Sequence, residues 1–75
     1  MNQLRRSFLD ATVDIDQNSA QVLVVAVESP TGAIETITNH SVNIPGKVEY
    51  YKNAYDDNFQ LKNNPAISIV GFMLV

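Results

Sequence analysis

The chain has 75 residues, a hydrophobic share of 45%, a net charge of −3 and no cysteine. This length allows one small domain, and the composition is that of a folded rather than a disordered protein. The lack of cysteine excludes a disulfide framework and a thiolate metal site. The acidic balance gives no general attraction to phosphate backbones or anionic membranes. We expect residues 1–75 to form a single α+β domain.

The N-terminal segment carries a basic pair, Arg5 and Arg6. No apolar stretch of signal-peptide or membrane-spanning length follows this pair. The sequence is therefore interpreted as that of a cytoplasmic protein without membrane contact.

The first predicted element is a strand over residues 7–16, where apolar and polar residues alternate. Asp10, Asp14 and Asp16 would then project from the same face of that strand. A solvated strand face is the favoured interpretation of these three carboxylates. A Ca²⁺ or Mg²⁺ site and an acidic stripe that imitates a nucleic-acid backbone are the alternatives.

A polar, turn-prone break at residues 17–19 leads to a second strand over residues 21–29. Its centre is continuously apolar and β-branched, which is typical of a central strand covered on both faces. A turn at residues 30–32 precedes a third strand over residues 33–38, whose poor alternation predicts an edge strand. These three strands are predicted to pair consecutively as hairpins.

The clearest predicted element is a helix that begins near Pro45 and ends before the Asn-Pro break at residues 63–65. Residues at spacings of three and four define its apolar face. They are Val48, Tyr51, Tyr55 and Phe59. Tyr50 lies at the margin of this face, which makes it a candidate for contact with a partner.

The last predicted strand covers residues 66–75 and is apolar at both parities. The resulting order is β-β-β-α-β, a small antiparallel sheet of three to four strands with one helix packed on one face. One helix covers only one face of a sheet, and monomers rarely expose large apolar patches. We therefore expect the second face to be covered, either by residues 1–8 or by self-association through the sheet face or the C-terminal strand. A homodimer or larger oligomer is the favoured prediction.

No arrangement of residues suited to catalysis or cofactor binding is recognised. His40 is the only histidine and falls in a predicted loop, and the three glycines lie singly at positions 32, 46 and 71. We predict a non-enzymatic chain with no catalytic, metal-binding or cofactor-binding residue.

The segment from Lys47 to Phe72 reads KVEYYKNAYDDNFQLKNNPAISIVGF. Its tyrosine-rich helix, its Asp56-Asp57 pair and its Asn-Pro break before an apolar strand resemble small uncharacterised proteins encoded by phages and prophages of Gram-positive bacteria. The resemblance covers about a third of the chain, all of it in the C-terminal half, and supplies no activity or site residue. It implies an accessory phage protein that acts in a bacterial cytoplasm or in a virion.

The sequence as a whole favours a protein-interaction module that self-associates or binds a host or phage protein. One alternative is a nucleic-acid-associated protein with an N-terminal arginine arm, although acidic residues outnumber basic ones. Another is a minor structural component of a virion. The candidate partner contacts are Arg5, Arg6, Asp10, Asp14, Asp16 and Tyr50.

Overall fold

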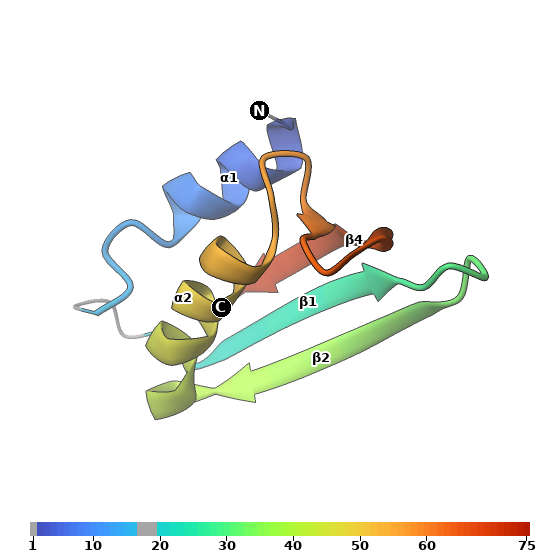
Figure 1. The fold of residues 1–75 in the computed structure, drawn as a ribbon. Helices are drawn as coiled ribbons and strands as arrows, with labels where there is room; N and C mark the ends of the chain where they lie inside the picture. The colour runs from blue at the N-terminus through green and yellow to red at the C-terminus, as the bar shows by residue number, and fades with distance from the viewer. Residues whose placement is uncertain (1, 17–19) are drawn as a thin grey trace.

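A computed structural model describes residues 2–16 and 20–75 of the chain. The elements are α1 (Gln3–Ala11), β1 (Val22–Glu28), β2 (Ile34–His40), a 3₁₀ turn (Ser41–Asn43), α2 (Ile44–Ala54), β3 (Gln60–Leu61) and β4 (Asn64–Leu74). The strands form one antiparallel sheet in the order β2-β1-β4-β3. Both helices lie on the same side of this sheet (Figure 1). The α+β class and the small antiparallel sheet are therefore confirmed. The predicted order of elements along the chain, β-β-β-α-β, and the single helix are wrong.

The largest correction concerns the N-terminal segment, which forms a helix where a strand was predicted. The Asn2 side chain accepts a hydrogen bond from the Arg5 N–H at 2.9 Å and so caps the start of α1. At the other end, the Thr12 hydroxyl donates to the Phe8 carbonyl oxygen at 2.8 Å. Phe8 is fully buried in the core, and this packing overrides the alternating pattern of residues 7–16. The predicted hairpin between the first two strands does not exist, and the turn predicted at residues 17–19 lies outside the described residues.

The β1–β2 hairpin and the last strand agree with the sequence-based expectation. β1 lies between β2 and β4, and β2 forms an edge of the sheet. Gly32 adopts a φ of +87° in the connecting turn, a conformation that favours glycine. The pairing of β1 with β4 shifts register between Ala26 and Val27, which marks a β-bulge.

The second helix is shorter than predicted, since α2 ends at Ala54. The Asp56 carboxylate accepts hydrogen bonds from the N–H groups of Asn58 at 2.9 Å and Gln60 at 3.0 Å. Such local side-chain bonds compete with helical hydrogen bonds. The resulting turn gives Phe59 a φ of +59° and places its ring in the core from a loop.

The core lies between the two helices and one face of the sheet. Its buried members are Phe8, Leu23, Val25, Ile44, Val48, Tyr51, Tyr55, Phe59 and Ile69. The Phe8 ring stands edge-on to Phe59 at 5.6 Å and to Phe72 of β4 at 5.2 Å between centroids. The prediction that Tyr51, Tyr55 and Phe59 form part of the core is confirmed.

In residues 2–16 and 20–75, neither helix is long and apolar enough to span a bilayer.

Candidate interaction surface

The two faces of the sheet are covered unequally. Leu23 and Val25 of β1 point toward the helices and are fully buried. The opposite face, called the open face below, carries the alternate residues of each strand. By strand register these are Ile34, Thr36, Thr38 and His40 of β2, Val22, Val24, Ala26 and Glu28 of β1, and Ser68, Gly71 and Met73 of β4. Because α1 packs with α2 on the other side (Figure 1), residues 3–11 do not cover the open face, and that alternative is wrong.

Apolar side chains are exposed at several positions on and around the open face. The exposed fraction is 52% for Met73 and 57% for Ile34. Val75, which exchanges backbone hydrogen bonds with Val22, is also exposed. Ile34 and Met73 lie toward different ends of this face, and the partly buried Val24 and Ala26 lie between them. Exposed apolar surface is a feature of many interaction sites.

The free edge of β2 can be located from the hydrogen bonds of its hairpin. The Ser29 N–H donates to the Ala33 carbonyl oxygen at 2.8 Å, and the Ser41 N–H donates to that of Gln21 at 3.0 Å. Hydrogen-bonded and non-bonded pairs alternate along an antiparallel ladder, so odd-numbered residues of β2 bond to β1. The even-numbered residues therefore direct their N–H and C=O groups away from the sheet. They are Ile34, Thr36, Thr38 and His40.

This edge lacks the features that commonly protect edge strands from pairing. β2 has seven residues, contains neither proline nor lysine, and pairs with β1 in an unbroken register. Its only carboxylate is Glu35, on the helix side of the sheet. β4, in contrast, pairs with β1 on one side, and on the other side β3 pairs with its first half, at Asn64 and Ser68. β2 is thus the longer stretch of free strand edge in the described sheet.

A shallow pocket of about 560 Å³ lies beside the end of β2 and the first turns of α2. It is lined by Asn39, Val42, Asn43, Gly46, Lys47 and Tyr50. Asn39 is only 9% exposed, and its Nδ2 is fully buried and makes no hydrogen bond to a described residue. The Lys47 Nζ lies 5.4 Å from the centroid of the Tyr50 ring, within the range of a cation–π contact. We call this group the edge pocket.

Tyr51 of α2 and Tyr55, the residue that follows this helix, belong to the core. Burial, followed by the nearby Tyr55 and Tyr50, raises the pKa of Tyr51, while the adjacent Asn39 amide opposes this rise. That amide lies near the Tyr51 hydroxyl without reaching hydrogen-bond geometry. Burial and then Tyr50 raise the pKa of Tyr55. Both buried phenols therefore stay neutral at physiological pH and act as packing groups.

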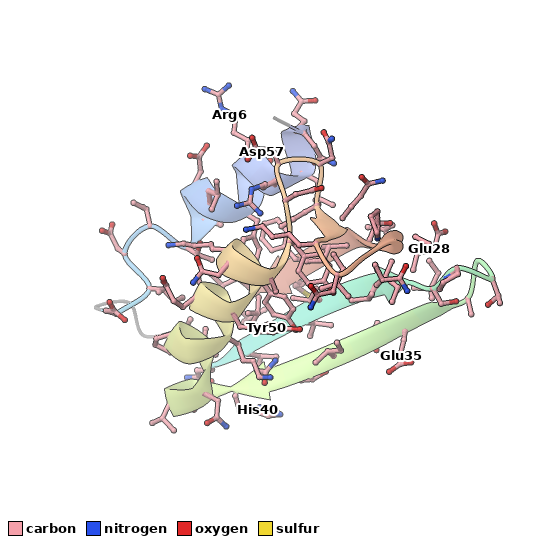
Figure 2. The ribbon with its side chains drawn as sticks, in the orientation of Figure 1. Arg6, Glu28, Glu35, His40, Tyr50 and Asp57 are labelled. Atoms are coloured by element: carbon pink, nitrogen blue, oxygen red, sulfur yellow. The ribbon has the colours of Figure 1, made fainter. Side chains whose placement is uncertain are left out.

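Of the basic pair, Arg5 is used inside the fold and Arg6 is exposed. The Arg5 guanidinium donates from Nη1 to the Tyr55 carbonyl oxygen and from Nη2 to that of Lys52, both at 3.0 Å. Its Nε lies 3.9 Å from the Asp57 carboxylate. These bonds satisfy carbonyl groups at the end of α2, so Arg5 does not lie on a free arm. Arg6 projects from α1 into solvent (Figure 2).

The three aspartates of the predicted acidic strand do not share a strand face. Asp10 lies on α1, whereas Asp14 and Asp16 lie in the turns that follow it, and all three are exposed. The predicted strand-face stripe is wrong because these residues form a helix end and turns. In the part of the chain that the structure describes, no three His, Asp or Glu side chains are grouped to hold a metal ion.

Tyr50 is exposed, at 49%, and lies on the edge pocket. Figure 2 shows it above the half of β2 that ends in His40, while Glu35 lies in the other half. His40 is the last residue of this strand, not a loop residue. Sequence reasoning missed Glu35, Asn39 and Lys47. The only available signal was the alternation of apolar and polar residues over 34–40, and it was too weak to show which residues face which side of the sheet.

Comparisons with protein-family models, with curated proteins and with solved structures gave no match.

Proposed function

We propose that this chain is a non-enzymatic protein-interaction module that self-associates through the sheet surface left uncovered by its helices. One observation carries the proposal: α1 and α2 pack on the same side of the sheet, and the open face and the β2 edge remain accessible. The apolar side chains there lose unfavourable contact with water when a second surface covers them.

The sequence resemblance suggests a setting for this module. We infer from it a small accessory protein of a phage or prophage of Gram-positive bacteria, which acts in a bacterial cytoplasm or in a virion. The nucleic-acid alternative receives less support, because Arg5 is occupied by backbone carbonyl groups and only Arg6 of the pair is free for phosphate contact.

Sedimentation velocity over a wide range of protein concentration tests this proposal. We expect the mass to rise above the 8.3 kDa of one chain as the concentration increases. High salt should leave the association largely intact, since apolar contacts are less sensitive to screening than ion pairs. A mass that stays at one chain under all conditions would contradict the proposal.

A further inference from the structure

We propose that the second copy binds at β2, so that the two β2 strands pair antiparallel about a two-fold axis at Ile37. This inference rests on the self-association proposed above and adds the edge, the register and the contacts. The outcome is one continuous sheet that runs through both copies, with their open faces on the same side.

The register follows from the hydrogen-bonding groups of the edge. Only even-numbered residues of β2 point their N–H and C=O groups outward, so these residues must bond to one another across the interface. Aligning all seven residues of β2 with those of its copy satisfies this condition. The bonded pairs are then Ile34 with His40 and Thr36 with Thr38. Shifting one β2 strand by two residues along the other still brings even-numbered residues opposite each other. Fewer residues then pair across the interface, so the full overlap is favoured.

In this register Glu35 of one copy lies opposite Asn39 of the other. Residues of a non-hydrogen-bonded antiparallel pair have Cβ atoms about 4.5–5.5 Å apart, within reach of a glutamate side chain. The Glu35 side chain of one copy then lies at the edge pocket of the other copy, which Asn39 and Lys47 help to line.

Charge in the edge pocket agrees with the same placement. Lys47 lines the pocket together with Asn39 and supplies a positive charge beside the incoming carboxylate. Because the interface has two-fold symmetry, the Glu35–Lys47 contact occurs twice. Each copy thus contributes one acidic side chain and one receiving pocket.

Apolar and hydroxyl side chains complete the two faces of the joined strands. Ile37 meets its own copy on the helix side. There it lines a groove of about 350 Å³ together with Val27, Ser29, Ala33, Ile34, Glu35 and Ile67. On the open face, Thr36 lies opposite Thr38, a pairing that stabilises antiparallel strands. No like charges face each other directly across this interface.

Two single charge reversals test the proposal when they are studied alone and mixed. Glu35→Lys places like charges at both contacts, and so does Lys47→Glu. We expect each variant alone to weaken association on the order of tenfold or more. An equimolar mixture of the two restores opposite charges at both contacts, so it should associate as tightly as the wild type. As the control, Lys62→Glu reverses an exposed charge beside β3, at the opposite edge of the sheet, and should leave association unchanged.

Thr36→Pro is a second, independent test. The Thr36 N–H points outward and takes no part in pairing with β1, so proline removes an edge donor while preserving the β1 ladder. Circular dichroism should show a folded chain, and sedimentation should show a monomer. Folded Thr36→Pro that still associates, or a mixture of Glu35→Lys and Lys47→Glu that stays monomeric, would overturn the β2 pairing.

Met73→Lys separates this inference from the broader proposal. Loss of association in Met73→Lys, with no effect of the edge variants, would place the interface on the open face. Self-association would then stand and the β2 register would be wrong. A wild-type chain that is monomeric at every concentration would contradict both.

Discussion

The Arg5 guanidinium donates a hydrogen bond to the Tyr55 carbonyl oxygen at 3.0 Å and so joins two segments that are 50 residues apart in the chain. A second bond to the Lys52 carbonyl oxygen uses the other arm of the guanidinium. The Cζ atom of the guanidinium also lies 5.6 Å from the centroid of the Phe59 ring. This one side chain therefore fastens α1 to the end of α2 and to the turn that follows.

Arg5→Ala should lower the free energy of unfolding by roughly 2–4 kcal/mol, since it leaves two carbonyl groups without their charged donor. Arg5→Lys should recover only part of this loss, because an ammonium group cannot reproduce the planar, two-armed geometry. Urea unfolding measures both. Arg6→Ala is the matched control and should stay within about 0.5 kcal/mol of the wild type. Equal effects at the two arginines would show that Arg5 is not a structural clamp.

The turn after α2 depends on Asp56 in a similar way. Asp56→Ala removes the acceptor of the Asn58 and Gln60 N–H bonds and should cost about 1–2 kcal/mol. Asp56→Asn keeps a side-chain carbonyl oxygen and should cost less. Asp57→Ala serves as the control. The Asp57 carboxylate is exposed, and its ion pair with the Arg5 Nε, at 3.9 Å, is long and therefore contributes little to stability. If Asp57→Ala lowers the unfolding free energy in urea more than Asp56→Ala does, the Asp56 hydrogen bonds are not what stabilises this turn.

Arg5 and Asp56 also show why the sequence predicted the strands better than the limits of the helices. The strands from Val22 and from Asn64 were recognisable because their apolar runs exceed what a loop or short amphipathic helix requires. The helix limits were not, since the end of α2 is set by Asp56 and Arg5 through contacts distant in sequence. Residues 7–16 have a strand-like period, whereas the Asn2 cap and the spacing of four between Leu4 and Phe8 favour a helix. The packing of Phe8 against Tyr51 and Phe59 decides between these two local patterns.

The candidate surface was predictable in kind but not in its residues. An excess of apolar sheet positions over one covering helix indicated an uncovered face. The members of the edge pocket come from β2 and α2, and only the pairing of β2 with β1 decides which side of the sheet Asn39 occupies. A one-residue change of register reverses that assignment, so sequence alone could not select Glu35 as its counterpart.

Alkaline pH should destabilise the fold through Tyr51 and Tyr55. Burial raises the pKa of both phenols above the tyrosine value of the unfolded chain, so the folded state holds its protons more tightly. Their contribution is fully present below about pH 10, the ordinary tyrosine value, and is lost as the pH rises through the folded-state pKa. Unfolding measured across this range should show a declining free energy. Tyr51→Phe should make the decline shallower, and an unchanged slope would contradict a role for Tyr51.

Asn39 offers a test of the core beside Tyr51. Asn39→Leu has similar volume and removes the buried Nδ2, which makes no hydrogen bond to a described residue. Replacing an unsatisfied buried donor by an apolar group should leave the unfolding free energy of the monomer unchanged or higher. Urea unfolding of dilute protein measures this effect. A clear loss of stability in Asn39→Leu would contradict the prediction and would show that the Asn39 amide forms a hydrogen bond with the nearby Tyr51 hydroxyl.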